Sequence, residues 1–320
     1  MPFFEADHNE SSSEGLLPPL IAILGPTACG KSEVAMSLAR CFGCEILNSD
    51  SRQIYREMEI GTAKPGRMDR QEIPHHLLDL VSPDETFSAG EFARQGRLVL
   101  AKLWASGGLP LLVGGTGFYY EALTRGLPDI NVDKNIRHRL QEMLELDGTF
   151  ALVDELRRID PAAALSIDIS NPRRVMRALE IIHATGRPLS EARAEVSPLH
   201  ARILPIVVDF PRDMLCERME QRIQNMLTMG LRDEVKRLNE LYDWSAPGMR
   251  TIGYAEWRSY FQGETDLDDT VEQINIHTRQ YAKRQVTWFK RRPGVEPIDL
   301  SEPGAESRIK FMVRNFLTAK

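Results

Sequence analysis

An eight-residue segment near the start of the chain constrains its fold more than any other feature. Residues 25–32 match the pattern GxxxxGK[ST] completely, between a short apolar run and a stretch with helical spacing. In such a segment, backbone N–H groups and the N-terminus of the following helix face the phosphate groups of a ligand. We therefore expect a pyrophosphate-binding loop made of Gly25, Pro26, Thr27, Ala28, Cys29, Gly30, Lys31 and Ser32.

Short apolar runs that alternate with helical patterns predict the surrounding architecture. The runs lie at residues 20–24, 45–47, 109–113 and 203–208. This alternation favours an α/β fold: a P-loop-type, mainly parallel sheet flanked by helices. Ligands of such a sheet bind at the carboxyl ends of the strands.

Between the third and fourth runs the pattern changes. From Asp133 to about Ala201 only helical spacing is found, and Asn171-Pro172 gives a helix cap followed by proline at the first helical position. We predict a helical insertion domain at residues 129–201. The catalytic core then comprises residues 19–128 and 202–320, and residues 1–18 form a disordered tail.

Composition excludes several classes of protein. A net charge of −6 and a pI near 5.8 argue against a surface that is basic throughout, although local basic patches still bind nucleic acid. No apolar run approaches the roughly 18 residues of a membrane span. Four scattered cysteines do not make a disulfide scaffold, and Cys41 and Cys44 are expected to be half-buried thiols beside a helix end. A cytoplasmic monomer is the default expectation.

The loop alone does not make the chain an NTPase. An NTP-hydrolysing protein usually carries a carboxylate after another strand, to help hold Mg²⁺. The third apolar run ends in Gly114-Gly115-Thr116 without an acid, and the fourth ends in Asp209. We favour a strand-end cap for Asp209 over a metal-binding role.

Further motifs follow the loop in a fixed order. They are Asn48-Ser49-Asp50-Ser51-Arg52-Gln53-Ile54-Tyr55, Gly61-Thr62-Ala63-Lys64-Pro65, Pro74-His75-His76-Leu77-Leu78-Asp79, Gly114-Gly115-Thr116-Gly117-Phe118-Tyr119, Asn171-Pro172-Arg173-Arg174-Val175-Met176-Arg177 and Thr251-Ile252-Gly253-Tyr254. As a set, these motifs resemble the tRNA dimethylallyltransferase family over roughly residues 19–293. The resemblance implies transfer of a dimethylallyl group from dimethylallyl pyrophosphate to N6 of adenine 37, in the anticodon loop of tRNA, assisted by Mg²⁺.

The resemblance also implies roles for particular residues. Asp50 is the general base that takes a proton from the amine, although an Asp at such a position also caps turns. Thr116 orients the target amine or caps the next helix. Lys31 and the loop amides stabilise the departing pyrophosphate, and Ser32 ligates Mg²⁺. Arg222 also reaches the pyrophosphate, with Arg218 one helical turn away as the alternative.

Contacts with tRNA are expected from three parts of the chain. One is the Asp50 motif with Thr116, and the others are the helical insertion and a segment near residue 250. The residues are Asp50, Ser51, Arg52, Gln53, Thr116, Arg137, Arg173, Arg174, Val175, Met176, Arg177, Arg250, Thr251, Ile252, Gly253, Tyr254 and Ala255. The basic stretch at residues 279–292 has a core stripe at Ala282, Val286 and Phe289, and its remainder, with Tyr281 and Trp288, faces phosphates, bases or solvent.

Two other functions compete with this one. A related prenyltransferase could act on free AMP, but the helical insertion and the basic C-terminal helix favour a large polyanion. A P-loop kinase or a nucleotide-binding module is disfavoured, because no carboxylate follows the third strand. Adjacent His75 and His76 have no third metal ligand at a suitable spacing and are expected to pack in a loop.

Overall fold

The computed structural model describes residues 16–127, 130, 132–194, 196–291 and 296–319. At its centre lies a six-stranded sheet in the order β3-β2-β4-β1-β5-β6, and every strand pair in it is parallel. The strands are β1 (Pro19–Leu24), β2 (Cys44–Asn48), β3 (His75–His76), β4 (Leu109–Gly114), β5 (Arg202–Asp209) and β6 (Ile298–Asp299). The α/β fold with a mainly parallel sheet is confirmed.

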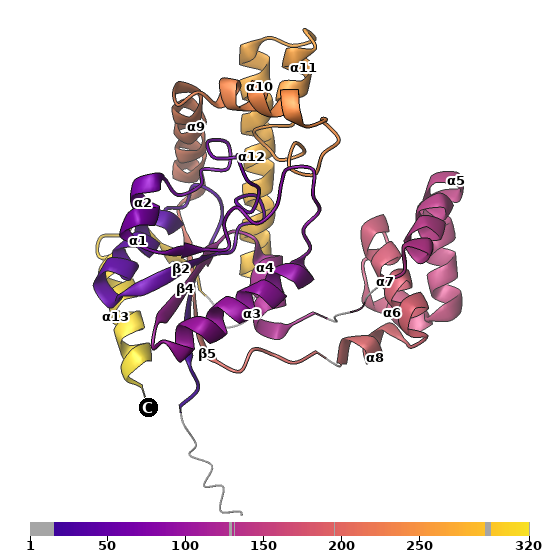
Figure 1. The fold of residues 1–320 in the computed structure, drawn as a ribbon, viewed down its shortest axis with the longest axis horizontal. Coiled ribbons are helices and arrows are strands. Elements are labelled where there is room, and N and C mark those ends of the chain that lie inside the picture. Colours follow the sequence, from indigo (N-terminus) through magenta and orange to yellow (C-terminus); the bar gives the residue numbers. More distant parts are fainter. Residues whose placement is uncertain (1–15, 128–129, 131, 195, 292–295, 320) are drawn as a thin grey trace, which may run out of the picture.

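Helices cover both faces of this sheet (Figure 1). Successive residues of β1 face opposite ways, so Ile21 and Ile23 pack in one core cluster while Leu20 and Leu24 pack in the other. The first cluster includes α1 (Lys31–Phe42) and α13 (Ala305–Thr318). The second cluster includes α3 (Ala89–Ala105), α4 (Gly117–Arg125), α10 (Leu231–Leu241) and α11 (Trp257–Phe261). Two helices, α9 (Arg212–Thr228) and α12 (Leu267–Lys290), contribute to both clusters.

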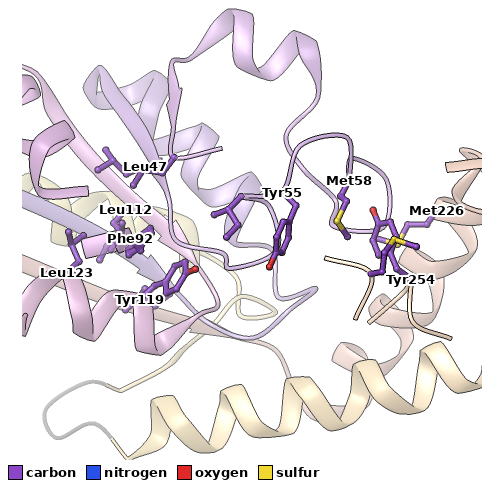
Figure 2. Packing of buried hydrophobic residues seen from close by; sticks show 14 of the residues in the cluster. Leu47, Tyr55, Met58, Phe92, Leu112, Tyr119, Leu123, Met226 and Tyr254 are labelled. Carbon is purple, nitrogen blue, oxygen red and sulfur yellow. The ribbon is translucent and has the colours of Figure 1, made fainter. Parts of the chain in front are cut away.

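The second cluster extends well beyond the sheet. Figure 2 shows it running from Phe92 and Tyr119, whose rings stack with centroids 4.1 Å apart, through Tyr55 to Met58 and Tyr254. This continuous apolar packing supports the irregular first part of the segment between β2 and β3, and α2 (Arg67–Glu72) forms the later part of that segment.

The insertion has a core of its own. It consists of α5 (Lys134–Ile159), α6 (Pro161–Ser166), α7 (Pro172–Thr185) and α8 (Leu189–Ala194), set beside the sheet domain in Figure 1. Its buried cluster draws only on residues between Leu140 and Ala192. The expected cap is present: the Asn171 side chain accepts a hydrogen bond from the Arg173 amide, and Pro172 opens α7.

Some local expectations were wrong. His75 and His76 form strand β3 beside β2, and His76 Nε2 lies 2.7 Å from a Glu45 carboxylate oxygen. Cys41 is exposed, whereas Cys44 is buried and burial raises its pKa to about 12. Strand β6 and helix α13 had no counterpart in the predicted elements. Residues 1–15 of the expected tail lie outside the described residues.

Candidate functional site

The phosphate loop occupies the carboxyl end of the central strand β1. Gly30 immediately precedes α1 in a left-handed conformation with φ of 80°, which glycine adopts without steric cost. The Lys31 ammonium group donates to the Pro26 carbonyl oxygen and lies 3.8 Å from Cys29 Sγ. Burial raises the pKa of the Cys29 thiol, and the positive charge of Lys31 opposes that shift. The cysteine is therefore a neutral packing residue.

A cavity of about 450 Å³ lies next to this loop, and α9 lines its far side. Ala28 to Glu33 contribute to the lining, together with Ala63 and with Arg218, Gln221, Arg222 and Asn225 of α9. One turn of helix separates the two arginines, so both face the loop.

The two arginines have different surroundings. Arg218 donates through Nε to the Ala28 carbonyl oxygen, and its guanidinium carbon lies 4.6 Å from the centroid of the Phe210 ring. Within the described residues, no hydrogen bond or ion pair engages Arg222. Burial lowers the pKa of Arg222, and the negative charges of Asp50 and Glu33 oppose that shift. Arg218 thus supports the loop, while Arg222 remains available to an anion.

Asp50 and Thr116 follow the neighbouring strands β2 and β4, and two hydrogen bonds join the segments that carry them. The Ser51 amide donates to Thr116 Oγ1 over 3.0 Å, and the Thr116 amide donates to the Ser49 carbonyl oxygen over 3.3 Å. Thr116 stands at the N-cap of α4, yet its hydroxyl makes no cap hydrogen bond there. Asp50 Oδ1 accepts from the Arg52 amide over 2.8 Å, which is a turn-stabilising contact.

Helix α12 adds a residue whose role in this pair was missed from the sequence. Tyr281 lies close to Thr116 and Asp50, and burial together with the charge of Asp50 raises the pKa of its phenol to about 12. A phenol that keeps its proton is a permanent donor. Tyr281, Gln285 and Trp288 share one face of α12 at helical spacing, a pattern visible in the sequence beside the core stripe of Ala282 and Phe289.

A network of charges braces the segment between Asp50 and the cavity. Gln53 donates to the carbonyl oxygens of Thr62 and Ala63. The fully buried Lys64 side chain forms ion pairs with Glu59 at 3.0 Å and Asp79 at 2.6 Å. Arg70 pairs with the same two carboxylates. Two of the motifs, residues 61–65 and 74–79, therefore contribute to internal architecture.

The residues expected to contact tRNA differ in exposure. On the insertion, Arg137, Arg173, Arg174 and Arg177 are exposed, but Val175 is fully buried in the helical cluster. Near residue 250, Arg250 and Ala255 are exposed, whereas Thr251, Gly253 and Tyr254 are buried. The buried side chains have no surface to offer to tRNA, so they are restricted to supporting roles.

The C-terminal part of α12 carries the basic residues predicted for it. Lys283, Arg284, Lys290 and Arg291 are exposed, while Arg279 pairs with Glu220. Arg292, the last of this group, lies outside the described residues.

Asp209, at the carboxyl end of β5, accepts a hydrogen bond from the Phe210 amide. Burial raises the pKa of its carboxyl group, and the nearby charges of Lys290 and Lys31 oppose that shift. A carboxylate that burial disfavours and that bonds the next amide behaves as a strand-end cap. Across the described part of the chain, no three or more His, Cys, Asp or Glu side chains gather as a metal-binding cluster. Nor is any described helix long and apolar enough to span a membrane.

Comparison with known proteins gives a consistent result. A family model described as IPP transferase matches residues 53–292, and one described as isopentenyl transferase matches residues 18–82. The tRNA dimethylallyltransferase of Roseiflexus castenholzii is 42% identical over 299 residues, which cover 92% of this chain and 97% of the relative. That of Shouchella clausii is 40% identical over 306 residues, covering 94% and 98%.

Solved structures agree with these relatives. A full-length tRNA isopentenylpyrophosphate transferase from Bacillus halodurans matches with a TM-score of 0.69 and 36% identity, covering 93% of this chain and 96% of that one. A eukaryotic dimethylallyltransferase acting on tRNA matches with a TM-score of 0.80 and 27% identity, covering 94% and 80%. The chain therefore belongs to the tRNA dimethylallyltransferase family and is an enzyme of the prenyltransferase class.

Proposed function

We propose that this enzyme transfers a dimethylallyl group from dimethylallyl pyrophosphate to N6 of adenine 37 in the anticodon loop of tRNA. The observation that best supports the proposal is the hydrogen bond from the Ser51 amide to Thr116 Oγ1, which joins the segment that carries the Asp50 carboxylate to the turn that carries the Thr116 hydroxyl. An amine acceptor requires such a pair, because it must be oriented and must lose a proton.

The donor side is assigned to the phosphate loop and Arg222. As N6 attacks the allylic carbon, the bond from that carbon to the bridging oxygen breaks and its electrons leave with pyrophosphate. The loop amides, Lys31 and Arg222 stabilise the charge that develops on the leaving group. The absence of internal partners for Arg222 among the described residues supports its assignment over Arg218.

The acceptor side is assigned to Asp50, Thr116 and the Asp50 segment. One carboxylate oxygen of Asp50 is used by the Arg52 amide, and we assign the other as the acceptor of the N6 proton. Thr116 accepts a hydrogen bond from the amine, while the Ser51 amide, which donates to Thr116 Oγ1, fixes the position of the hydroxyl. Ser51, Arg52 and Gln53 complete the proposed contact with the target nucleotide.

Mg²⁺ fits this arrangement through Ser32. The ion commonly keeps several waters and binds through one protein group plus substrate phosphates. Ser32 supplies an exposed hydroxyl beside Lys31 at the edge of the cavity, and the donor's phosphate oxygens would supply further ligands. When bound, the ion would neutralise charge on the leaving group.

The exposed arginines of the insertion and Arg250 are proposed to hold the tRNA backbone. The exposed residues are Arg137, Arg173, Arg174, Arg177 and Arg250. Met176 and Ile252 are both partly buried, which leaves each a limited surface for tRNA. Val175, Thr251 and Tyr254 support these surfaces from within.

One experiment separates the candidate functions. The protein is incubated with radiolabelled dimethylallyl pyrophosphate, Mg²⁺ and one of three acceptors: an unmodified tRNA with adenine at position 37, the same tRNA with guanine there, or AMP. We expect label in the first tRNA alone, and none when EDTA removes the metal. Label in AMP would overturn the proposal. In a parallel incubation with ATP, turnover of ATP without prenyl transfer would favour a kinase.

A further inference from the structure

A buried glutamine joins the two halves of the active site. Gln285 of α12 accepts a hydrogen bond from the Thr27 amide through Oε1 over 2.9 Å. Its Nε2 donates to the Gly115 carbonyl oxygen over 2.8 Å. Thr27 belongs to the phosphate loop, and Gly115 immediately precedes Thr116. One side chain thus bonds the donor-holding loop at one end and the acceptor-orienting turn at the other.

The chemistry of the two partners fixes the orientation of this amide. A backbone N–H requires an acceptor and a backbone C=O requires a donor, so only one placement of Oε1 and Nε2 satisfies both. Among the standard side chains, only asparagine and glutamine carry an acceptor and a two-proton donor on one rigid group, and asparagine is shorter by one methylene. Gln285 is only 6% exposed, so its two bonds do not compete with bulk water.

The Gln285 amide packs closely against the backbone at Gly115. A Cβ atom on Gly115 would lie 2.3 Å from Gln285 Nε2, closer than any real contact. One turn before Gln285 on the same helix, Tyr281 lies close to Thr116. The two hydrogen bonds of Gln285 therefore hold α12 in register with both the phosphate loop and the turn that carries Thr116.

We infer that Gln285 is a positioning residue that sets the separation between the donor's pyrophosphate and the Asp50–Thr116 pair. This inference rests on the proposed function. Prenyl transfer joins two substrates held by different loops, and rates fall steeply when reacting atoms are displaced by about 1 Å. Gln285 contacts neither substrate and acts through the backbone at Thr27 and Gly115.

The hydrogen bond from the Thr27 amide to Gln285 also determines which amides of the phosphate loop can bind the ligand. Because Gln285 holds the Thr27 N–H, that amide does not bind the pyrophosphate. The donors for the ligand are the later amides of the loop, with Lys31 and Arg222. Loss of Gln285 would release the Thr27 amide and leave the Gly115 carbonyl oxygen without its partner.

Two substitutions at this position test the inference. Gln285→Met fills a similar volume and makes neither bond. Gln285→Glu keeps an acceptor for the Thr27 amide but, when ionised, turns a second oxygen toward the Gly115 carbonyl. The matched controls are Gln273→Met and Gln273→Glu, at an exposed glutamine of the same helix.

The assay is a single turnover with enzyme in excess over tRNA, saturating labelled dimethylallyl pyrophosphate and rapid quenching. Its rate constant reports the chemical step in correctly folded enzyme, and a separate stoichiometric titration of the enzyme with labelled tRNA reports how much enzyme is active. We expect Gln285→Met to lower the rate constant about 100-fold and Gln285→Glu about tenfold or more. Dissociation constants for donor and tRNA should change by less than about threefold, and the Gln273 variants should match the wild type.

Three outcomes would overturn the inference. An unchanged rate constant with a smaller titrated fraction of active enzyme would mean that Gln285 serves folding alone. A donor dissociation constant that rises in step with the loss of rate would mean that it binds the donor. If the wild-type protein itself transfers no label to tRNA, the proposed function has failed, and the inference fails with it.

Discussion

The carboxylate of Glu234 offers a quantitative test of how the active-site segments are supported. It is 9% exposed and lies on α10, behind the segment that lines the cavity. Its oxygens accept hydrogen bonds from the amides of Glu59, Ile60 and Gly61 at 2.9 to 3.2 Å, and from the Tyr254 hydroxyl at 2.6 Å. One charged group thus holds two family motifs together.

The cost of Glu234→Gln follows from these contacts. An amide presents one oxygen and one NH₂ where the carboxylate presents two oxygens. The NH₂ group best replaces Oε1, because the Tyr254 hydroxyl can rotate and accept from it. The Gly61 amide then loses its partner, at about 1–3 kcal/mol for a buried donor, and the remaining bonds lose their charge assistance. We expect a loss of roughly 2–4 kcal/mol in the free energy of unfolding.

Urea unfolding followed by circular dichroism measures that loss, and hydrogen exchange locates it. Faster exchange should be confined first to the amides of residues 59–61. Glu240→Gln, at an exposed position of the same helix, is the matched control and should change stability by less than about 0.5 kcal/mol. If Glu234→Gln unfolds at the wild-type urea concentration and these amides exchange at the wild-type rate, the carboxylate does not hold the segment.

Four further predictions concern the proposed chemistry. Asp50→Asn should lower the single-turnover rate by about 10²–10⁴-fold while leaving tRNA affinity unchanged, as loss of a general base requires. Arg222→Met should raise the donor dissociation constant about ten- to hundredfold, the worth of a charge-assisted hydrogen bond, whereas Arg218→Met should mainly lower stability, because it removes the bond to Ala28. Asp209→Asn should keep transfer within about threefold and should gain stability relative to the wild type as pH rises. The sign follows because burial raises the pKa of Asp209 in the folded protein. As pH rises from the unfolded-state pKa to this raised pKa, the unfolded wild type ionises first and the wild type loses stability, whereas asparagine does not ionise. Arg173→Gln should weaken tRNA binding and reduce the slope of log affinity against log salt by about one.

Each of these has a contradicting result. Turnover within tenfold of the wild type in Asp50→Asn would remove the base assignment. Equal donor dissociation constants in the two arginine variants would contradict the assignment of the pyrophosphate contact to Arg222 alone. A large loss of transfer in Asp209→Asn would restore a metal-binding role to that carboxylate. An unchanged salt slope in Arg173→Gln would place tRNA on another surface.

The sequence predicts the phosphate loop and the strands around it because their signals are local. An apolar run, the pattern at residues 25–32 and a helical stretch stand next to one another, and each specifies its own structure. Strands β3 and β6 contain two residues each, too short for any periodic signal. Their pairing depends on neighbours that only the tertiary structure supplies.

The adjacency of Asp50 and Thr116 is a different kind of result. The sequence places each after a strand, but the hydrogen bonds that join Thr116 to the residues on either side of Asp50 require β2 and β4 to be neighbours. Strand order is a property of the whole sheet and leaves no local mark. The bridge made by Gln285 is more remote still, since it joins residues separated by 258 and 170 positions.

Burial also divides the family motifs into two kinds. Lys64 and Tyr254 belong to motifs that carry the family resemblance, yet each side chain is buried against charged or polar partners. A buried lysine between two carboxylates requires those partners, because an uncompensated charge there is costly. Internal packing and pairing are therefore sufficient reasons for these residues, without any contact with a ligand. Exposed members such as Arg173 and Arg250 have no such internal reason to be basic, and this makes them the better candidates for binding a polyanion.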